Sequence, residues 1–343
     1  MLSFNGNINK ITDRVTNYQL KLICIIFFLI AIRNNIISGQ DPQFSQFYSN
    51  PLYLAPSFAG GAESNRINAC YRHQWFNLPV KFIAYSFSYD FYSQPFNSGL
   101  GFLFVKDYAG SGELGVTSVG IQYSYNFQVI RGIRLRPGLH FSYLEHGVAY
   151  NKLKFIDQVM FDTPTSTSFV NPLDRTRDVD LSLSLLGYSK RIWLGITADH
   201  LLRPNISLYA DKYRLPLKFY YFGGVEILRR GRLLKPLDET VTIAFMLKHQ
   251  EYSTQLDLGV YWHKNPLVLG LWYRGLPPFN SQRGDAFIIL LGYKTPHFNI
   301  GYSYDITISN LISHAIGSHE ITATVKFLMP RKKKMGQIPC PEF

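Results

Sequence analysis

The sequence predicts an all-β fold, a transmembrane antiparallel β-barrel of about 14 strands in the outer membrane. Three observations predict it. Apolar and polar residues alternate through most of the chain, as they do between Gly115 and Tyr143. Charged residues make up only 17% of the 343 residues, whereas Tyr and Phe number 23 and 26. Connections of two different lengths alternate along the chain. Because successive side chains of a strand point to opposite faces, lipid can take the apolar face and an aqueous bore the polar face.

The first 39 residues are interpreted as a signal peptide. Leu22–Ile32 is an apolar run that follows several basic residues and is too short to cross a bilayer comfortably as a helix. Ser38-Gly39 offers small residues at a cleavage site, so Gln40 is expected to begin the mature chain. An uncleaved signal anchor is the alternative. Export of a chain with this strand pattern indicates the outer membrane.

Residues 40–62 are expected to be a periplasmic lead-in segment, because they combine prolines and aromatic residues without a clean period. A plug or a dock for a periplasmic partner is the alternative. Residues 329–343 are expected to be a basic C-terminal periplasmic tail, whose Arg331–Lys334 run is interpreted as solvated. A docking patch for an acidic partner is the alternative for that run.

The barrel is assigned to residues 63–328. Its expected strands share period-two alternation and about the length that a tilted strand needs to cross a bilayer. They are Arg66–Gln74, Ile83–Asp90, Gly99–Val105, Thr117–Gln128, Ile133–Tyr143, Asp178–Leu186, Ile192–Ala198, Leu217–Ile227, Thr240–Lys248, Gln255–Trp262, Leu267–Tyr273, Asp285–Tyr293, Phe298–Asp305 and Ser318–Phe327.

The lengths of the connections predict an orientation. Short ones such as Val129–Gly132 are expected in the periplasm, and long ones such as Leu144–Arg177 and Asp199–Pro216 outside, as in bacterial barrels. Phe91–Ser98 and Leu228–Asp238 are longer than this pattern predicts. A soluble β-sandwich is the alternative fold, but it would leave the signal peptide and the loop asymmetry unexplained.

Enzyme, metal and nucleic-acid functions find little support. The three cysteines have no metal-ligand spacing, so no metal or other cofactor is expected. No basic stripe suited to nucleic acid occurs outside the tail. His319-Glu320, or His200 with Ser207, would serve a hydrolase only if a serine and a histidine met on one wall. Alternation instead turns Ser303 and Asp305 toward the bore, so no catalytic residues are expected.

Charged residues on the polar face are expected to pair with one another inside the barrel, because charges in a narrow bore must be paired or hydrated. A selectivity ring in a channel is the alternative. The tryptophans are expected to form girdles at the two lipid–water boundaries. They are Trp75, Trp193, Trp262 and Trp272.

Several stretches, in order along the mature chain, carry a resemblance to a known family. They are QDPQFSQFYSNPLYLAPSFAG (Gln40–Gly60), NACYRHQW (Asn68–Trp75), AYSFSYD (Ala84–Asp90), DHLLRPN (Asp199–Asn205), GLWYRG (Gly270–Gly275), GYSYDITIS (Gly301–Ser309), GSHEI (Gly317–Ile321) and the ending KKKMGQIPCPEF. The chain resembles the PorP/SprF family of Bacteroidetes outer-membrane proteins, which is linked to type IX secretion and gliding motility.

This resemblance implies a non-catalytic barrel that supports the secretion or surface anchoring of a cognate cargo protein. The implied partners are type IX secretion components and the C-terminal domain of a secreted adhesin-like cargo, and the barrel is expected to be monomeric in outer-membrane lipid. A passive, porin-like channel for small solutes is the alternative. Four charged residues fall within the family-like motifs and are expected to form a structural cluster in the lumen. They are Arg72, Arg274, Asp305 and Glu320.

Overall fold

A computed structural model describes residues 41, 43–154, 156–162, 173–209, 212–231, 237–275, 286–308, 317–328 and 338–339. All of them belong to one unit of the chain, Gln40–Phe343. The predicted signal peptide and most of the predicted basic tail lie outside these residues. Among the described helices, none has the length and apolar character needed to span a membrane.

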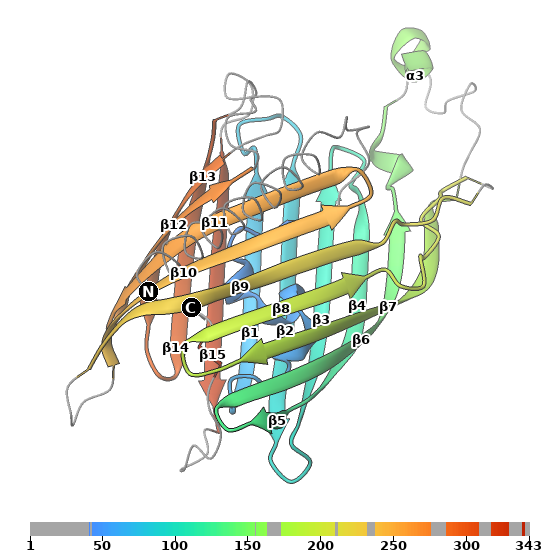
Figure 1. Ribbon diagram of the computed structural model, residues 1–343. Coiled ribbons are helices and arrows are strands. Elements are labelled where there is room, and N and C mark those ends of the chain that lie inside the picture. The colour runs from blue at the N-terminus through green and yellow to red at the C-terminus, as the bar shows by residue number, and fades with distance from the viewer. Residues whose placement is uncertain are drawn as a thin grey trace, which may run out of the picture. The chain divides into compact units, whose positions relative to one another are not determined.

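Antiparallel strands form a closed 14-strand barrel, which confirms the predicted fold class (Figure 1). The short β5 continues β4 beyond Asn126 and pairs with the same neighbour, β6, so the two act as one crossing. The first and last strands, β1 and β15, pair along their full lengths. The strands are β1 (Asn65–Gln74), β2 (Phe82–Ser93), β3 (Ser98–Ala109), β4 (Leu114–Tyr125), β5 (Phe127–Ile130), β6 (Ile133–Gly147), β7 (Arg175–Tyr188), β8 (Ile192–Asp199), β9 (Lys218–Gly231), β10 (Leu237–Gln250), β11 (Ser253–Lys264), β12 (Leu267–Arg274), β13 (Ala286–Lys294), β14 (Phe298–Thr307) and β15 (Ser318–Phe327).

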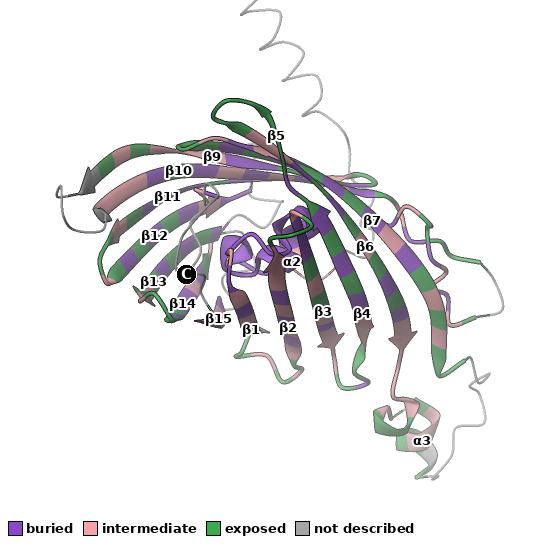
Figure 2. Ribbon diagram, turned by 90° about the horizontal axis from the view of Figure 1, so that it is seen from below, coloured by how far each residue is buried: buried purple, intermediate pink, exposed green. Residues whose placement is uncertain are grey.

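The predicted alternation is present in the strands, where buried and exposed residues follow one another in bands (Figure 2). On β7, for example, the side chains of Leu183 and Leu185 are exposed on the outer wall, whereas Ser182 and Ser184 are buried. Large apolar side chains that face outward suit contact with acyl chains, which take no hydrogen bonds. The outer wall therefore has the composition that a bilayer requires.

The two ends of the barrel differ in the lengths of their connections. At one end, hereafter the turn end, Arg131-Gly132 and Asn265-Pro266 join strands through tight turns. At the other, the loop end, residues 148–174 and 200–217 form long connections. The first contains η3 (Tyr150–Lys152) and α3 (Ile156–Phe161).

Two connections are shorter in the structure than the sequence predicts, because the strands are longer than predicted. β2 reaches Ser93 and β3 begins at Ser98, so only 94–97 join them. In the same way, β9 reaches Gly231 and β10 begins at Leu237. The loop-length pattern is thus clearer in the structure than in the sequence.

Residues 43–62, hereafter the plug segment, lie inside the barrel and are almost wholly buried (Figure 2). They form η1 (Phe47–Ser49), α2 (Pro51–Leu54) and η2 (Pro56–Phe58). Proline at the first position of α2 and of η2 fits a helix start, where the missing N–H has no helical partner to lose. The interpretation of this segment as a periplasmic lead-in is therefore wrong for the described residues. The alternative, a plug, describes their position.

The bore contains an apolar core as well as polar clusters. Phe47, Tyr48, Leu54 and Phe58 of the plug segment pack with inward apolar side chains of the wall. The wall residues of this core are Leu186, Tyr188, Trp193, Tyr220, Phe222, Ala244, Met246, Tyr261, Val268, Trp272, Ile288 and Leu290. This core was not predicted, because the alternation predicted a polar inner face and because the plug segment lies outside the strands.

Candidate functional site

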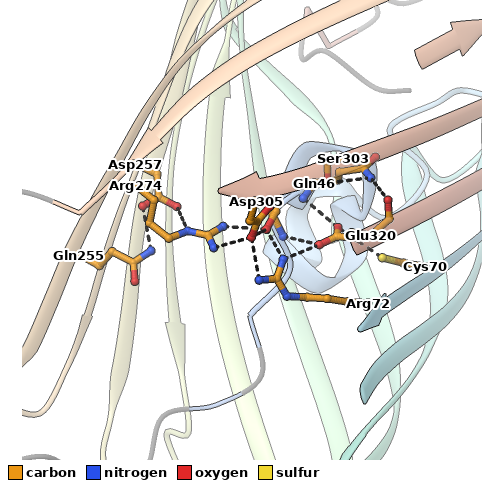
Figure 3. Close-up of polar contacts among 10 residues, drawn as sticks. Gln46, Cys70, Arg72, Gln255, Asp257, Arg274, Ser303, Asp305 and Glu320 are labelled. Carbon is orange, nitrogen blue, oxygen red and sulfur yellow. Dashed lines mark hydrogen bonds and ion pairs between the residues drawn. The ribbon is translucent and has the colours of Figure 1, made fainter. Parts of the chain in front are cut away.

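The four charged residues expected in the lumen come together in one buried network (Figure 3). Arg72 on β1 contacts both acids: its Nη2 lies 2.8 Å from Asp305 Oδ2 and its Nη1 lies 3.1 Å from Glu320 Oε2. Arg274 Nη1 lies 3.0 Å from the same Asp305 oxygen, and Arg274 Nε lies 3.3 Å from Asp257 Oδ2. These five residues, the bore cluster, join β1, β11, β12, β14 and β15.

The bore cluster also holds the plug segment. Glu320 accepts hydrogen bonds from the backbone N–H groups of Ser45 (2.6 Å) and Gln46 (2.9 Å). The Ser45 hydroxyl donates to Asp305 Oδ2 at 2.6 Å, and Arg274 Nη2 donates to that hydroxyl at 2.9 Å. These bonds attach the plug segment to the ion pairs of the wall. The bore cluster therefore holds Ser45 and Gln46 of the plug segment against the wall.

A second polar cluster lies where the plug segment begins. Asp41 Oδ2 lies 2.8 Å from His200 Nε2 and 2.5 Å from Lys218 Nζ. The other ring nitrogen of His200 lies 2.7 Å from Asp180 Oδ2, and Asp199 Oδ2 lies 3.5 Å from Lys218 Nζ. We call these five residues the mouth cluster. The sequence analysis did not single out Asp41, because it belongs to the presumed lead-in segment.

The electrostatics of the mouth cluster favour its charged forms. Burial lowers the pKa of His200, but the carboxylates of Asp41 and Asp180 outweigh burial and raise it to about 9. Burial raises the pKa of Asp41, yet Lys218 and His200 together hold it well below its usual value. A protonated His200 between two carboxylates is therefore the expected state near neutral pH.

Polar side chains of the wall satisfy the backbone of the plug segment, whose short helices satisfy little of it internally. Asn68 Nδ2 donates to Ser49 O at 2.6 Å, and Gln122 Nε2 donates to Leu52 O at 2.8 Å. Other such bonds are Ser57 N to Ser184 Oγ (2.8 Å), Ser124 Oγ to Ala59 O (2.7 Å), Thr197 Oγ1 to Leu54 O (3.3 Å) and Gly60 N to Asp90 Oδ2 (2.7 Å). Polar side chains of the wall thus form hydrogen bonds with the plug backbone from Ser49 to Gly60.

The prediction of a tryptophan girdle is wrong for two of its four members. Trp193 and Trp272 are 1% and 2% exposed and point into the bore, where they pack against Tyr48 and Phe47 with ring centroids 5.9 and 4.8 Å apart. Glycines on neighbouring strands make room for them: a Cβ at Gly259 would lie 2.1 Å from the Trp272 ring.

The other two tryptophans stay predicted girdle residues. Trp262 is 38% exposed on the outer wall and donates from Nε1 to Glu239 Oε1 at 2.9 Å. Trp75 follows β1 directly and packs on Phe82 with ring centroids 5.0 Å apart. Both lie close to strand ends, where a lipid–water boundary is expected.

His319 and His200, the candidate histidines of a hydrolase, do not contact a serine hydroxyl in the hydrogen bonds of the described residues. His319 Nδ1 lies 2.7 Å from the Tyr302 hydroxyl, and both ring nitrogens of His200 face carboxylates. Within the described ranges, no three His, Cys, Asp or Glu side chains gather in a way that could hold a metal ion.

A closed antiparallel barrel with an apolar outer wall and a filled, ion-paired bore defines the class: this is an outer-membrane β-barrel protein. The model of the family described as "Type IX secretion system membrane protein PorP/SprF" matches residues 36–325. The chain belongs to this family, a membrane β-barrel family of the type IX secretion system.

The solved structures similar to this chain include the following three. Omp33 of Acinetobacter baumannii has 7% sequence identity and a TM-score of 0.44, over 78% of this chain and 100% of that one. The CymD monoaromatic hydrocarbon channel has 9% identity and a TM-score of 0.48, over 81% and 93%. The toluene transporter TodX of Pseudomonas putida has 12% identity and a TM-score of 0.43, over 84% and 94%. No curated protein matches the sequence.

Proposed function

We propose that this protein is a non-catalytic, non-conducting barrel of the type IX secretion and gliding machinery, which supports secretion or surface anchoring of a cognate cargo protein. The observation that supports this proposal is the filled bore. The plug segment brings apolar side chains into the bore and bonds to the bore cluster, and Asp41, two residues before it, belongs to the mouth cluster. Because the plug segment packs against the inner wall and bonds to it, the barrel meets partners through its two ends.

The loop end offers the surface we propose for cargo. On α3, Ile156, Val159 and Met160 are 78%, 69% and 72% exposed. This helix lies in a connection between strands, where lipid is not expected to cover apolar side chains. Exposed apolar side chains on a loop are typical of protein contact sites. We propose the C-terminal domain of a secreted adhesin-like protein as cargo, and other type IX components as further partners of a monomeric barrel in outer-membrane lipid.

Deletion of the gene tests the cargo role. Export or surface retention of the cognate cargo is expected to be lost, and normal export and retention would contradict the proposal. A finer version replaces Ile156, Val159 and Met160 with serine in the chromosomal copy. The matched control replaces the exposed apolar Val129 and Ile130 of the turn end with serine. Loss of cargo export or surface retention in the α3 variant, but not in the control, supports the loop end as the surface that binds cargo.

Planar-bilayer recording of the purified barrel separates this proposal from its alternative, a passive channel for small solutes. A filled bore predicts no stable current, whereas a porin gives steady open steps. A stable open current in the wild-type protein would favour the channel and overturn the non-conducting part of the proposal.

A further inference from the structure

The chain from Asp41 through the plug segment has a definite direction in the bore, and Asp41 lies at the loop end. Asp41 contacts Lys218, the first residue of β9, and lies 3.5 Å from the side-chain amide nitrogen of Gln250, the last residue of β10. Its third contact, His200, follows the last residue of β8. All three positions belong to the loop end of their strands.

The segment then descends through the barrel. Ser45 contacts Arg72, Asp305 and Glu320, which lie two residues inside the loop ends of β1, β14 and β15. Further along, the Tyr48 hydroxyl donates to the carbonyl oxygens of Gly223 (3.0 Å) and Phe245 (3.1 Å), in the middle of β9 and β10.

The descent ends at the turn end. Gly60 donates to Asp90, near the turn-end limit of β2, and a Cβ at Gly99 would lie 1.9 Å from the carbonyl oxygen of Ala59. From there the chain passes directly into β1, which runs back toward the loop end. Ile338, far along the chain, packs beside Gly61 at the same end.

We propose that the chain enters its own barrel at the outer face of the membrane, so that Asp41 lies at the end of the barrel that faces the outside of the cell. Long loops lie outside in bacterial barrels and short turns lie in the periplasm. The N-terminal side of the plug segment then shares the outer face with the loops 148–174 and 200–217. It is no periplasmic dock, and Ile338 marks the opposite, periplasmic end.

The test is an epitope inserted directly before Asp41 in the full-length chain and detected by antibody on intact and on permeabilised cells. Two controls carry the same epitope after Glu251, in the β10–β11 connection of the loop end, and after Arg131, in the turn of the other end. We expect equal staining of intact and permeabilised cells for the insertions at Asp41 and Glu251. The Arg131 insertion is expected to stain only after permeabilisation. Staining of the Asp41 insertion only after permeabilisation would overturn the proposal.

A smaller change guards against an insertion that prevents folding. Gln40→Cys, in a chain with Cys70→Ala and Cys340→Ser, is treated on intact cells with a maleimide that cannot cross membranes. Tyr252→Cys in the same background is the loop-end control, because Tyr252 is exposed there. Labelling of both supports the proposal, and labelling of Tyr252→Cys without Gln40→Cys contradicts it.

Discussion

Arg66 and Asp90 form a double hydrogen bond between adjacent strands β1 and β2, with Nε–Oδ1 at 2.8 Å and Nη2–Oδ2 at 3.0 Å. The pair is buried at the turn end of the barrel. It also holds the plug segment, because Arg66 donates to Phe58 O at 3.3 Å and Asp90 accepts from Gly60 N at 2.7 Å. One ion pair therefore links β1, β2 and the plug segment.

Asp90→Asn is expected to destabilise the folded barrel by about 3–5 kcal/mol, because it leaves the buried guanidinium of Arg66 without its counter-charge. Urea unfolding in lipid vesicles, followed by the loss of the heat-modifiable gel band, measures the change. The matched control is Glu113→Gln, which removes the exposed ion pair with Lys152 and is expected to leave the unfolding midpoint unchanged. Equal midpoints for Asp90→Asn and wild type would contradict the assigned role of the pair.

Gly99→Ala is expected to displace the turn-end part of the plug segment, because the new Cβ would lie 1.9 Å from the carbonyl oxygen of Ala59. Limited proteolysis in vesicles should then cut near residues 59–62, where the wild type resists. Gly187→Ala is the control, since the nearest atom to its Cβ is the end of the flexible Leu135 side chain at 3.2 Å. Equal resistance of the two variants to the protease would contradict the predicted displacement of the plug segment.

Lipids carrying bromine on their acyl chains should quench Trp262 and Trp75 but not Trp193 or Trp272. The first two are predicted to lie at the lipid–water boundary, whereas the others are enclosed by the wall and the plug segment. Single-tryptophan variants, with the remaining tryptophans replaced by phenylalanine, make the comparison in reconstituted vesicles. Strong quenching of Trp193 or Trp272 would contradict their position inside the bore.

The mouth cluster predicts a loss of stability at alkaline pH. The pKa of His200 in the folded protein is about 9, above the ordinary value of about 6.5. Its contribution, on the order of 3 kcal/mol, is therefore complete below about pH 6.5 and is lost as pH rises through about 9. Asp41 stays charged throughout this window because its pKa is lowered.

Urea unfolding of the wild type at pH 7 and pH 10, beside His200→Gln, measures this contribution. The wild type is expected to lose more stability between the two values than the variant does. Parallel losses in both proteins would show that His200 adds nothing through its charge.

The barrel could be predicted from sequence because its signal is local. The alternation at Leu183 and Ser184 repeats in nearly every strand, and a bilayer requires it wherever a strand crosses. Arg72, Arg274, Asp305 and Glu320 could be grouped because alternation turns all four toward one enclosed space, where charges must meet partners.

The plug segment could be named only as an alternative, because nothing local distinguishes a folded segment inside a barrel from a proline-rich extended chain. Its helices are too short to produce a 3.6-residue period, and Tyr48 or Leu54 gains its environment only from strands distant in the sequence. Trp193 and Trp272 were misassigned for the same reason. Tryptophan has a strong general preference for membrane boundaries, and only the position of Phe47 and Tyr48 reveals a drier place inside the bore.

The position of Gln46 bears on the order in which we expect the barrel to assemble. Its side-chain amide donates to Ser303 on β14 and to the Glu320 carbonyl on β15, directly beside the seam between the first and last strands. A finished ring would admit side chains as large as Tyr48 and Phe58 only through its mouths. We therefore expect the strands to assemble around the plug segment. The pairing of β1 with β15 is then expected to form last.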